Sequence, residues 1–373
     1  MRLLICAGGT GGGVYPALSV LRALGDNAVD VLWVGGQNGM ETDLVQRAGI
    51  PFTAIPAAGV HGIGIRSLPK NLYKIGRGII ASRRILNQFK PDVLFFTGGF
   101  VAVPMALAGR NIPSLVFVPD IEPGLALRFL VRSAKMTAVS TEDSIHYFSK
   151  KTRIVQTGYP TRSELKTWNS EIAIRHFGLE SELPILLIAG GSSGARSINH
   201  AILNVLNELL KICQVIHISG KLDWAEVQDA KDKLDNSIAG RYHSYPYLHE
   251  DIGAAFACAN LVISRAGAST LGEYPLFGLP AILVPYPHAW RYQKVNADYL
   301  QKHGSAIVIE DDQLPNRLLL TVKEFITDAN RLENMSQAMM KLATPDSASH
   351  LAELIKSLGK TSPIKTEGLP WSA

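Results

Sequence analysis

The sequence predicts an α/β protein built from two doubly wound units, each a parallel sheet with helices on both faces. Short and almost wholly apolar runs that end at glycine or proline alternate with stretches of helical spacing, as expected of buried parallel strands. The same rhythm occurs twice in 373 residues, a length typical of two domains. The charge also changes sign: residues 1–162 hold 18 basic and 9 acidic side chains, whereas residues 163–373 hold 19 and 23.

The order of these elements defines the expected domains. Strands are predicted at 2–9, 29–36, 91–99, 113–119 and 136–140 in the first half, and at 184–191, 214–220, 259–267 and 280–287 in the second. Helical spacing joins them at 14–24, 40–48, 72–89 and 195–210. The predicted domains cover 1–162 and 163–345. A helical segment at 346–358 is expected to pack back toward the first domain, before a loose polar tail at 359–373.

Composition excludes several classes of protein. Hydrophobic residues make up 47% of the chain and charged residues 18%, which is enough apolar material for two buried cores. Cys6, Cys213 and Cys258 are too few and too far apart for a disulfide framework and indicate a reducing compartment. No apolar run reaches the roughly 18 residues of a membrane span. The histidines lack ligand spacing and residues 310–312 are predicted to be a solvated turn, so no metal site is expected.

Two glycine-rich loops each follow the first predicted strand of a half. Residues 8–13 read GGTGGG, and residues 190–196 read GGSSGAR. Glycines at such a position let backbone N–H groups approach an anion at the positive end of a helix, and Ser192 adds a hydroxyl. A dinucleotide fingerprint is disfavoured, because Val14 stands where its last glycine belongs. The loops therefore predict a ligand that carries phosphate, with a tight turn that binds no ligand as the alternative.

A third segment, residues 264–273, also runs from a predicted strand into a helix. It reads SRAGASTLGE and ends on Glu273. A carboxylate there can accept hydrogen bonds from both hydroxyls of a ribose, each worth about 1.5–3 kcal/mol. The alternative is that Glu273 interacts only with the helix dipole. Because ligands of open parallel sheets bind at the carboxyl ends of the strands, these segments predict a site in a cleft between the two halves.

Residues 63–90 form a basic and amphipathic stretch. Nine aliphatic residues are interleaved with seven Lys and Arg, and no acidic residue occurs. Such a segment is typical of attachment to a membrane surface, where each basic residue contributes about 1 kcal/mol on an anionic leaflet. Nucleic acid is disfavoured as a partner, because aromatic interleaving is sparse and no recognisable binding motif is present. A solvated helix face is the alternative.

Nine motifs together resemble the MurG family, the membrane-associated N-acetylglucosaminyltransferases that make lipid II. In order they read AGGTGG, WVGGQNGMETDLV, FKPDVLFFTGGFVAVP, TGYPTR, IAGGSSGARSIN, SRAGASTLGE, PAILVPYPH, YQKVNA and ATPDSA. The resemblance implies a GT-B fold of two Rossmann-like domains, the first facing the acceptor and the membrane and the second binding a UDP-sugar. It also implies inverting transfer of GlcNAc from UDP-GlcNAc to a lipid-linked muramoyl-pentapeptide, at the cytoplasmic face of the membrane and without an essential metal or cofactor.

The resemblance also implies which residues bind the donor. Thr10, Gly11 and Gly12 would face the diphosphate, and Ser192 would contact a donor phosphate. Arg162 would approach the donor across the junction between the domains. The second phosphate and the ribose would be held by Ala268, Ser269, Thr270, Leu271, Gly272 and Glu273. Leu248 would hold the uracil through its backbone, whereas Gln293 and Asn296 would bind the sugar hydroxyls. The alternative for these last two residues is a solvated helix face.

Two departures from the family pattern lie on the acceptor side. Gly13 stands where the glycine loop of the family ends in histidine. Residues 117–124 read FVPDIEPG where the family carries a His-Glu-Gln-Asn run before Pro-Gly. Asp120 and Glu122 are therefore the candidates for the general base that deprotonates the acceptor, with His61 as a weaker candidate. The alternative is that both acids are exposed loop residues that cap the next helix.

Three functions follow from these observations. Transfer of GlcNAc to the lipid-linked muramoyl acceptor is the leading hypothesis. A related GT-B enzyme that glycosylates another lipid, such as diacylglycerol, is favoured by the altered acceptor side. A donor-binding protein without turnover is the third, because the usual histidine is missing. The sequence does not determine the acceptor, the base or the oligomeric state.

Overall fold

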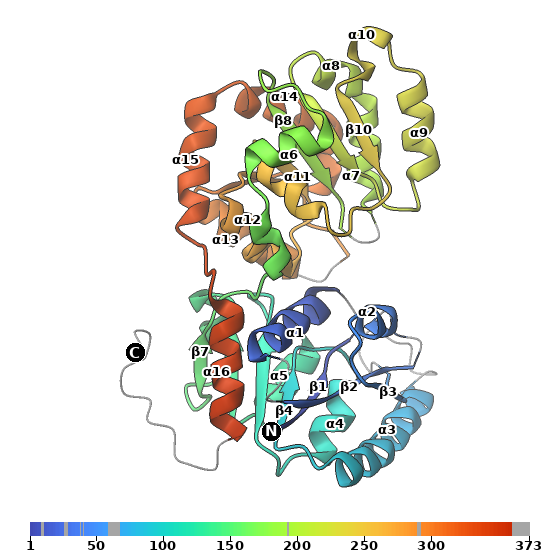
Figure 1. Ribbon diagram of the computed structural model, residues 1–373, viewed down its shortest axis with the longest axis vertical. Helices are drawn as coiled ribbons and strands as arrows, with labels where there is room; N and C mark the ends of the chain where they lie inside the picture. Colours follow the sequence, from blue (N-terminus) through green and yellow to red (C-terminus); the bar gives the residue numbers. More distant parts are fainter. Residues whose placement is uncertain are drawn as a thin grey trace. The chain divides into compact units, whose positions relative to one another are not determined.

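The computed structural model describes residues 1–8, 11–25, 29–37, 39, 41–58, 68–191, 194–288 and 292–359 (Figure 1). The chain divides into two compact units. Unit 1 consists of Met1–Thr161 and the segment that begins at Pro345, and unit 2 consists of Arg162–Thr344. The tail predicted at 359–373 lies outside the described residues from position 360 onward.

Unit 1 contains a seven-stranded sheet in the order β3-β2-β1-β4-β5-β6-β7, with every neighbouring pair parallel. Its strands are β1 (Arg2–Cys6), β2 (Asp30–Gly36), β3 (Phe52–Ile55), β4 (Val93–Phe96), β5 (Ser114–Val118), β6 (Met136–Val139) and β7 (Ile154–Gln156). The two edge strands, β3 and β7, were not predicted. Both are short and largely half-buried, so neither forms the continuous apolar run of a central strand.

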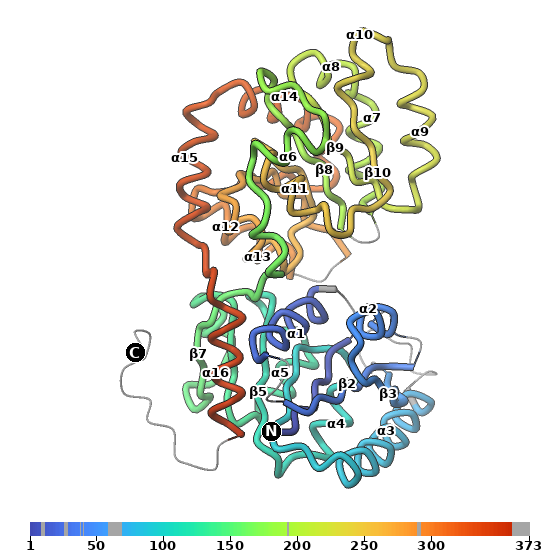
Figure 2. The backbone as a smooth tube through the Cα atoms, in the orientation of Figure 1, coloured from blue at the N-terminus to red at the C-terminus, as the bar shows by residue number. Residues whose placement is uncertain are grey.

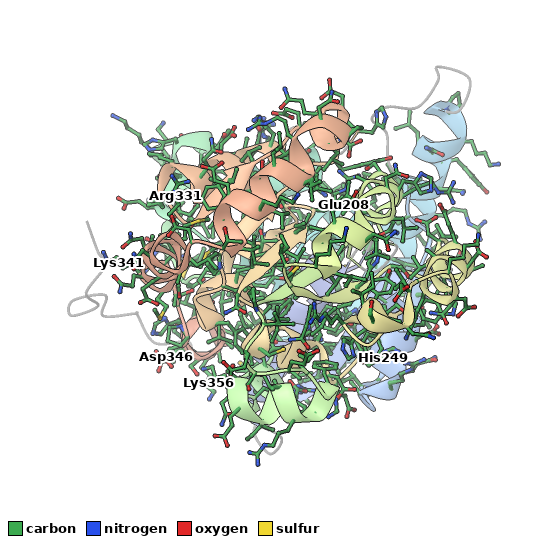
Figure 3. All side chains as sticks on the ribbon, turned by 90° about the horizontal axis from the view of Figure 1, so that it is seen from above. Glu208, His249, Arg331, Lys341, Asp346 and Lys356 are labelled. Carbon is green, nitrogen blue, oxygen red and sulfur yellow. The ribbon has the colours of Figure 1, made fainter. Side chains whose placement is uncertain are left out.

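Helices flank this sheet in the order α1 (Gly11–Leu24), α2 (Glu41–Arg47), α3 (Leu68–Phe89), α4 (Ala102–Ala108), α5 (Leu125–Val131), the 3₁₀ helix η2 (Glu142–Tyr147) and α16 (Ser347–Gly359). The last of these, α16, packs against α1, as Figure 1 shows. Its apolar face is buried through Leu351 and Ile355, whereas Lys356 lies on the exposed face (Figure 3). The chain therefore returns to unit 1 after completing unit 2.

Unit 2 contains a six-stranded sheet in the order β10-β9-β8-β11-β12-β13, again with all pairs parallel. Its strands are β8 (Ile185–Ala189), β9 (Gln214–Ile218), β10 (Tyr242–Tyr245), β11 (Leu261–Ser264), β12 (Ala281–Leu283) and β13 (Ala306–Val308). The tube in Figure 2 can be followed from β8 through α7 and α8 to β9, and through α9 and α10 to β10. The edge strands β10 and β13 were again missed by the sequence patterns.

The helical elements of unit 2 are η3 (Ser163–Thr167), α6 (Ser170–Phe177), α7 (Arg196–Asn204), α8 (Leu206–Leu210), α9 (Trp224–Asp232), α10 (Asn236–Ala239), α11 (Ile252–Cys258), η4 (Ala268–Leu271), α12 (Glu273–Phe277), α13 (Tyr292–Lys302), η5 (Asp311–Gln313), α14 (Leu314–Ile326) and α15 (Ala329–Met340). The single helix predicted at 195–210 was wrong, because the backbone leaves the helical region at Val205. Apolar residues continue at helical spacing on both sides of Val205, so periodicity alone does not reveal the break.

Both sheets have a topological switch point beside their first strand. In unit 1 the strand order reverses between β1 and β4, and in unit 2 it reverses between β8 and β11. Loops that leave adjacent strands in opposite directions open a crevice at the carboxyl edge of such a sheet. The glycine-rich loops follow β1 and β8, and the segment that ends at Glu273 follows β11. Across the part of the chain that the structure describes, no helix is long and apolar enough to cross a membrane.

Candidate functional site

The loop after β8 lies tightly against the end of the neighbouring strand β9. Gly191 and Gly194 have φ values of +85° and +79°, a region that glycine adopts without strain. A Cβ atom on Gly194 would collide with the carbonyl oxygen of Ser219, so no larger residue fits there. The loop is followed by α7, which begins at Arg196. The predicted phosphate ligand Ser192 lies outside the described residues.

The segment after β11 is held by its own backbone. The side chain and the backbone N–H of Thr270 both donate to the carbonyl oxygen of Gly267, at 2.7 and 3.0 Å. This turn starts η4 and leads directly into α12, whose first residue is Glu273. Most of the predicted segment is buried, and Ser269 keeps partial exposure. Any contact with phosphate would therefore come from backbone N–H groups and from the hydroxyl of Ser269.

Arg162 and Glu273, which were each predicted to bind the donor, form an ion pair within unit 2. Nη2 of Arg162 donates to Oε1 of Glu273 at 3.2 Å, and the two side chains are only 21% and 11% exposed. Burial raises the pKa of Glu273, while the charge and hydrogen bond of Arg162 and a hydrogen bond from Ser269 oppose this shift. A carboxylate acceptor beside a guanidinium can serve the hydroxyls of a ribose and an adjoining phosphate. The sequence did not predict that these two residues pair.

Gln293 and Asn296 connect α13 to the loops after β12 and β11. Asn296 is fully buried, and its side-chain amide donates to the carbonyl oxygen of Ala266 at 3.1 Å. Oε1 of Gln293 accepts from the backbone N–H of Tyr286 at 2.8 Å. The solvated-face alternative is therefore wrong for Asn296, which positions the loop after β11. Contact of either residue with a sugar stays a prediction, as does the contact of the buried Leu248 with uracil.

A second ion pair at this edge of the sheet was missed. Nη1 of Arg265 donates to Oδ1 of Asp311 at 2.5 Å, and Nη2 donates to the hydroxyl of Ser197 in α7 at 2.7 Å. The guanidinium also lies over the ring of Tyr286, 5.1 Å from its centroid. The solvated turn predicted at 310–312 was therefore wrong for Asp311, whose side chain is 24% exposed and joins α7 to the loop after β11. A lone acidic run carries no local signal of a distant arginine.

In unit 1 the loops after β1 and β4 approach each other through their backbones. A Cβ atom on Gly99, which has a φ of +85°, would lie 2.6 Å from the carbonyl oxygen of Gly8. The carboxylate of Glu41, buried at the start of α2, occupies the space into which a side chain on Gly8 would point. Oε1 of Glu41 accepts from the N–H of Gly36 at 2.8 Å. Glu41 thus shapes the approach to the first glycine loop, a role that its motif METDLV did not suggest.

The start of α1 is packed against β4 and the end of β7. The hydroxyl of Thr97 donates to the carbonyl oxygen of Gly13 at 2.8 Å, and that of Tyr159 donates to the carbonyl of Gly12 at 3.4 Å. A Cβ atom on Gly13 would lie 3.2 Å from two oxygen atoms of Thr97, closer than most such contacts. A side chain at position 13 would therefore require Thr97 to shift by a few tenths of an ångström. Gly11 is the first residue of α1, and Thr10 lies outside the described residues.

The two candidate bases follow β5, and the structure distinguishes them. Glu122 is 6% exposed, and its Oε1 accepts from Nη2 of Arg128 at 3.0 Å. Nε of Arg128 donates in addition to the carbonyl oxygen of Pro123. The alternative of an exposed loop acid is therefore wrong for Glu122, whereas Asp120 is half-buried. The weaker candidate, His61, lies outside the described residues.

Comparisons with known proteins identify the family. The N-terminal and C-terminal domain models of glycosyltransferase family 28 match residues 3–139 and 185–351. A relative from Roseiflexus sp. (strain RS-1), named UDP-N-acetylglucosamine--N-acetylmuramyl-(pentapeptide) pyrophosphoryl-undecaprenol N-acetylglucosamine transferase, is 35% identical over 96% of this chain and 95% of its own length. A relative of the same name from Halothermothrix orenii is 37% identical over 97% of this chain and all of its own. The crystal structure of Acinetobacter baumannii MurG is 26% identical, with a TM-score of 0.77 over 95% of this chain and 99% of that one. The chain belongs to the MurG family.

Membership of the MurG family confirms the resemblance and the predicted two-domain GT-B fold. A UDP-GlcNAc 2-epimerase from Neisseria meningitidis, solved with UDP-GlcNAc, shares the fold with a TM-score of 0.66 at 14% identity, over 96% of this chain and 100% of that one. At that identity the likeness concerns the fold alone. Among the described residues, no three His, Cys, Asp or Glu side chains gather closely enough to hold a metal ion. Metal-independent transfer remains a prediction.

Proposed function

We propose that this protein transfers GlcNAc from UDP-GlcNAc to a lipid-linked muramoyl-pentapeptide with inversion at the anomeric carbon. The names of its MurG-family relatives state N-acetylglucosamine transfer to an N-acetylmuramyl-(pentapeptide) pyrophosphoryl-undecaprenol. The observation that carries the proposal is the Arg162–Glu273 ion pair at the carboxyl edge of the sheet of unit 2. It offers a carboxylate for a ribose diol and a cation for a diphosphate in one place.

This geometry supports the following donor roles. Glu273 accepts hydrogen bonds from the two ribose hydroxyls, while Arg162 turns its guanidinium toward the diphosphate. Backbone N–H groups of the loops after β8 and β11 hold the phosphates, as helix starts commonly do. Gln293, at the start of α13, binds the sugar through its side-chain amide nitrogen, since its Oε1 accepts from Tyr286 and the amide of Asn296 donates to the loop after β11.

The reaction is a displacement at the anomeric carbon. A hydroxyl of the muramoyl acceptor attacks from the face opposite the diphosphate and loses its proton to a general base as the new bond forms. The bond from the anomeric carbon to the diphosphate oxygen breaks at the same time, and UDP leaves with the electron pair. Arg162 and the backbone N–H groups of unit 2 stabilise the charge that develops on the leaving group, so a metal ion is not required.

Asp120 is the stronger candidate for the base. Glu122 has one carboxylate oxygen engaged by Arg128 and is buried, so it holds the loop before α5 in place. Asp120 stands two residues earlier and is more accessible to an acceptor. Both follow β5, next to the switch-point strand β4.

The outer face of α3 supports attachment to an anionic membrane at the cytoplasmic face. Leu72, Tyr73 and Ile80 are 55%, 67% and 55% exposed and fall on one side of the helix. Exposed basic side chains such as Arg83 and Arg84 share this face, and the guanidinium of Arg77 lies 6.0 Å from the centre of the Tyr73 ring. Gly78 brings the opposite side of α3 against Pro56 and Pro104, so no larger residue fits there. Exposed apolar and basic side chains on one helix face form the kind of surface that interfacial helices present to lipid.

Glycosylation of a different lipid is the second candidate function. It is favoured by Gly13 and its contact with Thr97, and by the FVPDIEPG segment at 117–124, because both differ from the family on the acceptor side. A donor-binding protein without turnover is the third.

A single assay separates the three candidates. The full-length protein is incubated with UDP-GlcNAc labelled in the sugar and with lipid I, and the lipids are extracted and resolved. Label in lipid II supports the proposal. Label in diacylglycerol, supplied in a parallel reaction, supports the second candidate. Unreacted donor in both reactions, together with measurable UDP binding, supports a binding protein.

A further inference from the structure

A continuous chain of buried polar side chains lies behind the loop after β8. It begins at Tyr242 in β10 and passes through His217 in β9 to Asn199 in α7 and Asp223 before α9. His217 and Asn199 are 0% exposed, Tyr242 is 1% and Asp223 is 5% exposed. The chain ends at Arg196, the first residue after the glycine loop, where Nε donates to Oδ1 of Asp223 at 2.9 Å.

The hydrogen bonds permit only one arrangement of protons in this chain. The amide nitrogen of Asn199 donates to the carbonyl oxygen of Ser219 and to Oδ2 of Asp223, both at 2.8 Å. Its oxygen must therefore accept from Nε2 of His217, 3.0 Å away. Nδ1 of His217 then accepts from the hydroxyl of Tyr242 at 2.7 Å. Burial lowers the pKa of His217 to about 3, so the imidazole is neutral and holds its proton on Nε2.

This arrangement presents Arg196 in a defined orientation. The side chain of Asp223 is 4% exposed, whereas that of Arg196 is 66% exposed. Burial raises the pKa of Asp223, but hydrogen bonds from Arg196 and Asn199 outweigh this effect. The net pKa lies below its ordinary value, so the carboxylate stays charged. Binding through Nε leaves both terminal amino groups of Arg196 for another acceptor, and the guanidinium has no second partner among the described residues.

Because the Arg196 side of this ion pair is solvent-exposed, screening by water reduces what the pair adds to stability, so the ion pair's own stabilisation does not account for the buried chain behind it. The position of Arg196 does. It directly follows the loop of Gly191 and Gly194, and the carbonyl of Ser219, which accepts from Asn199, is the group against which Gly194 packs. One polar chain thus holds both the loop and the arginine.

We propose that Arg196 binds the diphosphate of the nucleotide donor through its terminal amino groups, and that the chain from Tyr242 to Asp223 orients its guanidinium. Arg196 is the binding residue, and Tyr242, His217, Asn199 and Asp223 are positioning residues. The inference rests on the proposed function, because it requires that unit 2 binds a nucleoside diphosphate.

The test compares ligands with and without the diphosphate on the full-length protein. Titration calorimetry measures UDP and uridine binding to the wild type and to Arg196→Gln. We expect the affinity for UDP to fall about tenfold or more, the scale of one charge-assisted hydrogen bond, while that for uridine is unchanged. Arg196→Lys keeps the charge but not the Nε donor and should retain part of the affinity. Arg175→Gln is the control, since Arg175 is an exposed arginine of the same unit that pairs with Glu171 in α6.

A double-mutant cycle tests the positioning role. Tyr242→Phe removes only the hydroxyl that donates to His217, and it should weaken UDP binding in the wild type but not in the Arg196→Gln background. Equal losses in both backgrounds would show that Tyr242 acts on the fold alone and would overturn the positioning role. UDP binding unaffected by Arg196→Gln, or an equal loss for uridine, would overturn the role of Arg196. A wild type that binds no UDP would instead overturn the proposed function.

Discussion

The two units arrange their central strands in the same order, but different kinds of contact shape the edge of each sheet beside its switch point. In unit 2 that edge is lined by paired charges from distant segments, such as Arg162 with Glu273 and Arg265 with Asp311. In unit 1 it is shaped by close backbone contacts, such as that between Gly8 and Gly99. Similar sheets thus present paired charged side chains at this edge in unit 2 and closely packed backbone at the same edge in unit 1.

The difference predicts how each unit would interact with a ligand. Paired charges in unit 2 are largely desolvated before any ligand arrives, and burial raises the pKa of Glu273 as a result. A ligand hydroxyl that donates to Glu273 restores part of the lost solvation, which favours binding of a small polar molecule. The glycines of unit 1 leave room beside the backbone and expose backbone N–H groups. The candidates for the general base, Asp120 and Glu122, lie in a separate loop after β5. The following predictions test this division, from the largest expected effect to the smallest.

Removal of the base should affect catalysis and leave donor binding intact. We expect Asp120→Asn to lower kcat by about 10²–10⁴, the usual contribution of a general base, with UDP affinity unchanged. Glu122→Gln should mainly lower the melting temperature, because it breaks the ion pair with Arg128. Steady-state kinetics and UDP titration measure both quantities. If neither variant changes kcat, unit 1 does not supply its base from this loop.

Neutralisation of α3 should release the protein from membranes. Replacement by Gln of Lys70, Lys74, Arg77, Arg83 and Arg84 should abolish cosedimentation with vesicles that contain anionic lipid, since each basic residue near the surface contributes about 1 kcal/mol. UDP affinity should not change. The matched control replaces five exposed basic residues of unit 2: Arg175, Lys211, Lys233, Lys302 and Lys341. Equal loss of vesicle binding for both variants would indicate a general charge effect and no specific role of α3.

Loss of the Glu273 carboxylate should weaken recognition of the ribose. Glu273→Ala is expected to lower UDP affinity by about ten- to a hundredfold, which corresponds to one charge-assisted hydrogen bond. A dideoxy analogue of UDP without the ribose diol should bind wild type and variant alike. Calorimetric titration of both ligands makes the comparison. Equal losses for the two would mean that Glu273 acts only through its ion pair with Arg162.

The backbone contacts of unit 1 predict opposite outcomes for two glycines. Gly99→Ala should destabilise the protein by about 1–3 kcal/mol, because the new Cβ meets the carbonyl of Gly8 and φ is positive. Gly76→Ala, in the middle of α3 with open space around it, should stabilise by about 0.5–1 kcal/mol. Urea unfolding of both variants measures the two changes. A neutral Gly99→Ala would contradict the close approach of the two loops.

The buried imidazole of unit 2 predicts a dependence of stability on pH. Burial lowers the pKa of His217 from 6.5 to about 3, so between these values the unfolded state binds the extra proton. The contribution of neutral His217 to the free energy of unfolding is therefore fully present above pH 6.5. It is lost as the pH falls toward 3, by at most about 1.4 kcal/mol per pH unit. His217→Gln cannot be protonated, so the free energy of unfolding should depend less on pH below 6.5. Identical slopes for both proteins would show that His217 does not stay neutral.

The amino-acid sequence by itself determined the fold class and the placement of the candidate site along the chain. Central strands are local apolar runs, and the glycine loops that follow β1 and β8 stand next to them in sequence, so both can be recognised without tertiary information. Edge strands such as β3 and β10 lack that signal because they are partly exposed. The hydrophobic periodicity likewise does not reveal the break at Val205, because the helices on both sides of it bury apolar residues in the same core.

Only the tertiary structure decided which residues meet. Arg162 and Glu273 are 111 positions apart, and Arg265 and Asp311 are 46 apart, so their pairing depends on strand order and on the packing of the connecting helices. The structure also showed that Glu122 is held by Arg128, and that Asn296 supports the loop after β11. The spacing of apolar residues in the sequence indicates which face of a helix or strand a residue occupies. It does not indicate the residue's partner, because contacts between distant segments depend on how the whole sheet is assembled.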